Sequence, residues 1–194
     1  MFLIRSTHKA RFLPTNYFAG ASLIVCLVWS MFTAGAVAQE PLEIEDRGDT
    51  ILVASGGRPV LEYQFVSKPK KSYVGRLFSR DGTQILRDAP HDHLHHHALM
   101  FAVAVDGVDF WSENDDCGSQ RPVARAEIRT ASRDGRQSAT ISHRLDWMAP
   151  NGSDVLLIES RTIEILRVEK AGPTLLVWKC RLAPPGKKSV TLTG

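Results

Sequence analysis

The sequence predicts an all-β protein, an antiparallel β-sandwich of about nine short strands. In residues 60–66 the apolar Leu61, Tyr63 and Phe65 alternate with polar residues, which is the pattern of a half-buried strand. Tight-turn signals recur along the chain as Asp-Gly pairs at residues 81–82, 106–107 and 134–135. After residue 38 no segment has the apolar spacing of a convincing helix.

The first half of the domain divides into short apolar runs separated by turn residues. We expect strands at residues 42–46, 51–54, 60–66, 73–79 and 83–86. Arg47-Gly48-Asp49 and Ser55-Gly56-Gly57 contain the residue types that favour turns. Asp81-Gly82 separates the last two runs, so residues 73–86 are expected to form a hairpin.

The second half contains longer runs. Residues 98–105 are continuously apolar, which predicts a strand buried on both faces, and a strand at 108–111 follows the turn at Asp106-Gly107. Residues 155–168 could be mistaken for a helix, but their β-branched residues favour a long strand. Further strands are expected at residues 123–130, 138–147, 174–182 and 189–193.

The first 38 residues have the features of a signal peptide. Arg5, Lys9 and Arg11 precede an apolar stretch at residues 18–32, and Ala36-Val37-Ala38 forms a small-residue cleavage site. We therefore expect a signal peptide at 1–38 and a single β-sandwich domain at 39–194, secreted or periplasmic and not bound to a membrane after cleavage. An uncleaved membrane anchor is the alternative, because the apolar segment approaches spanning length.

The charge balance argues against a nucleic-acid partner. The 194 residues carry 24 Lys and Arg against 21 Asp and Glu, a net charge of +3. The leader contains three of the basic residues and no acidic one, so the remaining 21 basic residues balance the 21 acidic ones. A neutral domain lacks the basic surplus of a nucleic-acid-binding protein.

Two cysteines remain after the leader, Cys117 and Cys180. Export would permit a disulfide between them. The sequence leaves two alternatives open, a disulfide and a pair of buried thiols, because spacing alone does not show whether the two meet.

Five histidines lie within residues 91–97, which makes this segment the main candidate site. If it is extended, His91, His93 and His95 share one face, opposite Asp92 and His96. Imidazoles near a carboxylate can transfer protons at a sugar hydroxyl or carbonyl. The leading hypothesis gives this role to His93, His95 and His96, with Asp92 or Asp109 orienting them.

Two alternatives use the same segment differently. His93, His95 and His96 could instead ligate a transition-metal ion, copper, iron or zinc, in an oxygenase-like protein. The third reading is a non-catalytic binding module, in which the histidines are solvated or only contact a ligand. The sequence does not identify a cofactor.

The segment after the next Asp-Gly turn supplies candidate contacts for a ligand. Phe110 is expected in the core, whereas Trp111 could offer its ring as a stacking surface for a sugar. Asp109 could orient a histidine or cap the turn. We assign substrate binding to Trp111 and His91, with a carbohydrate or another small molecule as the partner.

The histidine segment and the strand after it resemble secreted bacterial proteins labelled methane oxygenase PmoA, a domain of unknown function. That family has a D-H-P-H-H-[RK]-[GS] motif, then an apolar strand, then V-N-G-x-D-F-W. The corresponding residues here are Asp92, His93, Leu94, His95, His96, His97 and Ala98, then Val105, Asp106, Gly107, Val108, Asp109, Phe110 and Trp111. Tyr73-Val74 and Asp81-Gly82 also match, so the resemblance covers residues 42–194.

Three positions depart from the motif: Leu94 stands for proline, His97 for a basic residue and Ala98 for glycine or serine. The chain also stops before such domains end, so the resemblance implies an incomplete, C-terminally truncated sandwich. The predicted fold is similar to the large sandwich of galactose-mutarotase-type proteins, in which histidines and a carboxylate act on sugars. This likeness implies a carbohydrate-type ligand.

Overall fold

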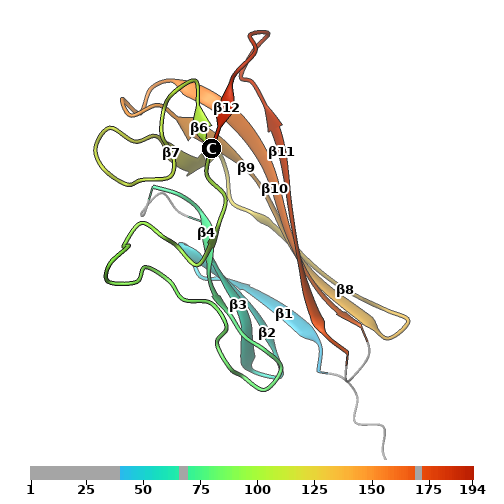
Figure 1. Ribbon diagram of the computed structural model, residues 1–194. Helices are drawn as coiled ribbons and strands as arrows, with labels where there is room; N and C mark the ends of the chain where they lie inside the picture. Colours follow the sequence, from blue (N-terminus) through green and yellow to red (C-terminus); the bar gives the residue numbers. More distant parts are fainter. Residues whose placement is uncertain (1–39, 66–69, 169–171) are drawn as a thin grey trace, which may run out of the picture. The chain divides into compact units, whose positions relative to one another are not determined.

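The structure is a computed structural model that describes residues 40–65, 70–168 and 172–194 (Figure 1). Every regular element in these residues is a β-strand, which confirms the predicted all-β class. The described residues contain no helix long and apolar enough to cross a membrane. The predicted signal peptide, residues 1–38, lies outside the described residues.

The first sheet follows the chain order β1-β2-β3-β4-β5, with all neighbours antiparallel. Its strands are β1 (Leu42–Asp46), β2 (Thr50–Ser55), β3 (Arg58–Gln64), β4 (Tyr73–Leu77) and β5 (Leu99–Met100). The alternation predicted around β3 is confirmed, because Leu61 and Tyr63 are buried whereas Glu62 and Gln64 are partly exposed.

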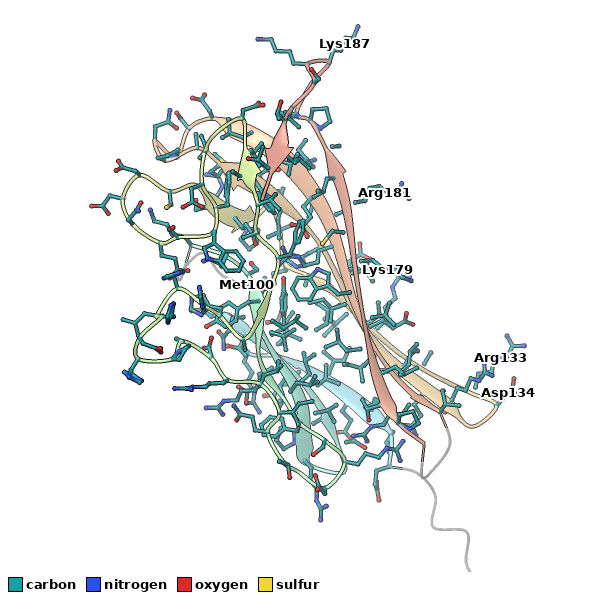
Figure 2. The ribbon with its side chains drawn as sticks, viewed as in Figure 1. Met100, Arg133, Asp134, Lys179, Arg181 and Lys187 are labelled. Atoms are coloured by element: carbon teal, nitrogen blue, oxygen red, sulfur yellow. The ribbon has the colours of Figure 1, made fainter. Side chains whose placement is uncertain are left out.

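The second sheet has the order β11-β10-β9-β7, and β8 also pairs with β9. These strands are β7 (Ser119–Pro122), β8 (Glu127–Arg133), β9 (Arg136–Met148), β10 (Val155–Val168) and β11 (Thr174–Ala183). The long strand predicted at 155–168 is confirmed with the same bounds. Asp134 and Gly135 form the β8–β9 turn with φ of 50° and 73°, and Figure 2 shows Arg133 and Asp134 at the tip of that hairpin.

The two sheets pack their inner faces against each other, which confirms a β-sandwich. One apolar cluster combines Ile51, Val53 and Leu61 of the first sheet with Ile141 and Ile163 of the second. The opposite side of the second sheet is polar on β11, where Lys179 and Arg181 are exposed and point outward (Figure 2). A separate pair joins β6 (Ala104–Val105) to β12 (Leu192–Thr193).

Several predicted strands are wrong. Residues 98–105 form only the short β5 and β6, and the residues between them are partly exposed. The side-chain amide of Gln120 donates to the carbonyl of Phe101 at 2.7 Å, so a side chain takes the place of a neighbouring strand. Residues 83–86 and 108–111 make only the isolated bridges Phe78–Gln84 and Val105–Val108. The strand expected at 123–130 is confirmed only over residues 127–130, which begin β8, and β7 ends just before it.

Between the sheets lies a fully buried arginine, Arg161 on β10. Its five N–H groups all reach acceptors, which is the complete donor capacity of a guanidinium. They bond to both carboxylate oxygens of Glu159 (2.6 and 2.8 Å), the hydroxyl of Tyr63 (3.1 Å), the carbonyl of Ser72 (2.7 Å) and the side-chain carbonyl of Gln120 (3.1 Å). One side chain therefore joins β10 to β3, to the start of β4 and to β7.

Glu159 is buried as completely as its partner. Its carboxylate also accepts the indole N–H of Trp147 at 2.9 Å and the thiol of Cys180 at 2.9 Å. The guanidinium of Arg161 further lies 4.7 Å from the ring centre of Trp178. Cys180 thus remains a free thiol, and so does the buried Cys117, which settles the alternatives left open by the sequence.

His143 extends this inner network on β9. Burial raises the pKa of Tyr63 to about 12, so its neutral hydroxyl can donate to Nε2 of His143, 2.7 Å away. Burial, aided by the charge of Arg161, lowers the pKa of His143 to about 4. His143 is therefore a neutral acceptor at pH 7, a buried core histidine held by a single strong hydrogen bond.

Replacing Arg161 by methionine tests the inner ion pair. Arg161→Met would leave the buried carboxylate of Glu159 without its cation, so we expect unfolding free energy to fall by about 3–5 kcal/mol in urea titrations. Arg129→Met is the matched control. Arg129 and Glu127 are also an arginine and a glutamate two residues apart on one strand, β8, but they face solvent, with 3.1 Å between the charged groups. The expected cost of the control is below about 1 kcal/mol. Equal losses in both variants would contradict the assignment.

His143 makes stability depend on pH in a defined direction. Its folded pKa of about 4 lies below the ordinary value of 6.5, so the unfolded chain binds an extra proton between these values. The stabilisation is complete above pH 6.5 and is lost as pH falls towards 4. Between pH 7.5 and pH 5, the unfolding free energy of the wild type should fall by about 2 kcal/mol more than that of His143→Gln, as measured by urea denaturation. His91→Gln on the exposed loop, the control, should keep the wild-type profile.

Candidate functional site

The histidine segment is a series of turns and not the extended strand that its pattern suggested. The amide of His93 donates to the carbonyl of Pro90 at 2.8 Å, and the amide of His96 donates to the carbonyl of His93 at 2.9 Å. These turns break the predicted alternation of faces, so His96 joins His93 and His95 although it was expected on the opposite face. His91 is exposed at the start of the loop.

The three rings form a compact group at the surface. His93 stacks on His96 with centroids 4.7 Å apart, His95 meets His96 edge-on at 4.4 Å, and His93 and His95 are 6.2 Å apart. Trp111 lies edge-on to His96 at 5.4 Å and is 45% exposed. We call these four side chains the histidine–tryptophan surface. The neighbouring Phe110 is buried against the core, as predicted.

The two predicted carboxylates have different positions. Asp92 lies at the surface with its oxygen 3.2 Å from Nδ1 of His93, so it can orient that ring. Asp109 instead accepts the amides of Trp111 at 2.6 Å and of Ser112, and the latter residue contributes most to lowering its pKa. Asp109 therefore fixes the turn that presents Trp111, and among the described residues it makes no contact with a histidine ring.

A buried lysine holds the two halves of this surface together. The ammonium group of Lys71, with a side chain only 1% exposed, bonds to the carbonyls of His95 (3.3 Å) and Trp111 and to the carboxylate of Glu113 (3.3 Å). Three partners use its full donor capacity. Burial lowers the pKa of Lys71, and the charge of Glu113 opposes that shift. The lysine thus ties the histidine loop to the tryptophan turn.

The last histidine of the segment, His97, is buried beneath the surface. Its Nδ1 lies 2.9 Å from the carboxylate of Asp88, its Nε2 lies 3.1 Å from that of Glu113, and its ring stacks on Tyr73 at 4.1 Å. The ring donates both bonds only when both nitrogens carry protons. The hydroxyl of Tyr73 bonds to the same Asp88 at 3.2 Å, and this carboxylate helps burial to raise the pKa of Tyr73.

Sequence reasoning missed His97 and Lys71 as parts of the site. In the sequence, His97 stands out only as a departure from a family motif. It is, however, the one histidine that directly precedes the apolar run leading into β5. Its carboxylate partner, Asp88, lies nine residues before it in the chain. Lys71 carried no local signal, because its partners are 24 and 40 residues away along the chain.

The protonation state of His96 suits hydrogen bonding to a neutral ligand. Desolvation lowers the pKa of His96, and the neighbouring His95 and His93 lower it further. At neutral pH the ring therefore has a free acceptor nitrogen, which can accept a hydroxyl proton. Within the described ranges, no group of three or more His, Cys, Asp or Glu side chains has the geometry to hold a metal ion.

Lys71→Met tests the tie between loop and turn. The variant keeps the apolar stem but leaves two carbonyls and Glu113 without the ammonium donor, so we expect a loss of about 1–3 kcal/mol in unfolding free energy. The signals of the Trp111 indole and of the His95 and His96 rings should shift together in NMR spectra. Lys179→Met, on the outward face of β11, should leave both unchanged. Intact ring signals in Lys71→Met would contradict the proposed tie.

Comparison with known proteins identifies a family but no activity. Residues 50–194, more than half of the chain, match the model of a family of unknown function, DUF6807. That description carries no methane-oxygenase label. No significant match was found among curated proteins or among solved structures. The chain belongs to the family of unknown function DUF6807.

Proposed function

We propose that the protein binds a carbohydrate-type ligand at the histidine–tryptophan surface. The observation that carries the proposal is the exposed ring of Trp111 at 5.4 Å from His96, beside two further imidazoles. An aromatic ring provides a platform for the apolar face of a sugar, and nearby polar groups then fix its orientation. A half-exposed tryptophan that contributes little to the core is suited to this role.

The imidazoles supply the polar half of the contact. A neutral ring has one donor and one acceptor nitrogen, which matches a hydroxyl group that both donates and accepts. His96 is the side chain assigned to take a hydroxyl proton, because its lowered pKa keeps it neutral. His93 and His95 contact neighbouring hydroxyls, and Asp92 orients His93.

The remaining predicted residues have supporting roles in this proposal. Asp109 positions Trp111 through its amide, and His91 contacts the ligand from the exposed start of the loop. We place this function outside the cytoplasm on the basis of the signal peptide predicted at residues 1–38. The resemblance to PmoA-labelled proteins stays a prediction and adds no step to the proposed binding.

Calorimetric titration of the full chain with a panel of mono- and oligosaccharides tests the proposal. For a saccharide that binds, Trp111→Ala should weaken affinity by about tenfold or more, since removal of a central aromatic contact costs roughly 1–2 kcal/mol. His96→Ala should also weaken binding. The control is Ile128→Ala, which removes an exposed apolar side chain from β8 and should change nothing.

The results separate this proposal from its alternatives. Saccharide binding that survives both Trp111→Ala and His96→Ala, or no binding across the panel, would overturn the proposal. Stoichiometric copper, iron or zinc in untagged protein, lost in a His93→Ala/His95→Ala variant, would favour the metal-dependent alternative. Chemical conversion of a bound saccharide, lost in His96→Gln, would extend binding to catalysis.

A further inference from the structure

A second candidate site lies in a polar pocket of about 450 Å³ on β3 and β4. Its volume falls in the range of small-molecule sites, roughly 300–1,000 Å³. Gln64 alternates with the core-facing Tyr63, so the pocket opens on the side of the first sheet away from the core. Gly75 and Arg76 on β4, and Gln84, Arg87 and Asp88 from the segment after it, complete the wall.

The pocket lining contains two carboxylates and two guanidinium groups. Arg76 is paired with Glu62 at 3.6 Å, and Asp88 is paired with His97 at 2.9 Å. Within the described part of the chain, Arg87 has no ion pair. Because each carboxylate already has a partner, the guanidinium of Arg87 is available to an anion. A planar guanidinium recognises a carboxylate through two parallel hydrogen bonds.

The rest of the lining suits hydroxyl groups better than an apolar ligand. The side-chain carbonyl of Gln64 accepts the hydroxyl of Thr50 at 3.0 Å, which leaves its N–H₂ group for a ligand. The N–H₂ group of Gln84 donates to the carbonyl of Leu86 at 3.0 Å, which leaves its side-chain carbonyl. At Gly75 the floor has no side chain, and an added Cβ would lie 3.3 Å from the ring of Tyr73. The Cγ atom of Gln64 would lie 3.7 Å from the same Cβ, so the floor at Gly75 is closely packed.

We propose that this pocket binds a small polyhydroxylated carboxylate, an acidic sugar, with Arg87 holding the carboxylate group. Arg76 lies on the same wall in its pair with Glu62, and the two glutamine side chains contact the hydroxyls. The proposal goes beyond the function proposed above, because the pocket shares no side chain with the histidine–tryptophan surface. It therefore stands or fails independently of that surface.

The test compares sugars that differ only in the acidic group. The full chain carrying Trp111→Ala, which weakens the histidine–tryptophan surface, is titrated by calorimetry with D-glucuronate and D-galacturonate, and with D-glucose and D-galactose as their neutral counterparts. We expect the acids to bind at least about tenfold more tightly, as a charge-assisted bond to Arg87 predicts. Arg87→Ala should abolish that difference, and Arg87→Lys should retain part of it. Arg58→Ala, an exposed arginine of β3 outside the pocket, is the control.

A second readout locates the bound acid. Asp88 lines the pocket and bonds to His97, so a bound uronate should shift the ring signals of His97 in NMR spectra, in Trp111→Ala as well as in wild type. Equal affinity for acidic and neutral sugars would overturn the proposal, as would uronate binding unchanged by Arg87→Ala. Inorganic phosphate that binds as tightly as the uronates would also overturn it, because the pocket would then select charge alone.

Discussion

The burial of one positive charge, on Arg161, constrains the whole sandwich. A cation away from water is tolerated only when a carboxylate and further acceptors surround it. Glu159 supplies the carboxylate from the same strand, and Tyr63, Ser72 and Gln120 supply the other acceptors from three separate segments. The relative placement of β3, β4, β7 and β10 is thus tied to the geometry of a single planar group, while the apolar contacts around it are less directional.

Three consecutive residues, 71–73, connect the buried Arg161 with the candidate site. The carbonyl of Ser72 accepts a hydrogen bond from Arg161. Its neighbours Lys71 and Tyr73 instead contact the candidate site, where Lys71 pairs with Glu113 and the ring of Tyr73 stacks on His97. Lys71 holds the histidine loop and the tryptophan turn, and Tyr73 supports the ring of His97. A short segment before β4 therefore connects the inner charge pair with the surface groups, and loops without regular structure are fixed by it.

The sequence predicts the strands well where periodicity is complete, as at β1 and β10, because alternation reports directly on burial. It predicts poorly where an apolar run lacks a neighbouring strand, as in residues 98–105. The inward face of β10 did contain a signal, since Glu159 and Arg161 share the register of buried residues. Within the candidate site, the sequence singles out His93, His95 and His96 but places His96 on the wrong face, because the turns of the loop are not visible in its pattern. The tie through Lys71 was not predicted, because hydrogen bonds to distant carbonyls leave no pattern in the chain.

Three imidazoles and Trp111 form one surface at the histidine loop. This arrangement can be measured in a two-dimensional NOE spectrum, with ring signals assigned through single histidine variants. We expect cross-peaks between the rings of His93 and His96, whose centroids are 4.7 Å apart, and between His96 and the Trp111 indole, whose centroids are 5.4 Å apart. The buried pair of Phe110 and Trp147, at 4.8 Å, gives an internal reference. Cross-peaks for the buried pair alone, with none between the histidines and Trp111, would show that the four side chains do not form one surface.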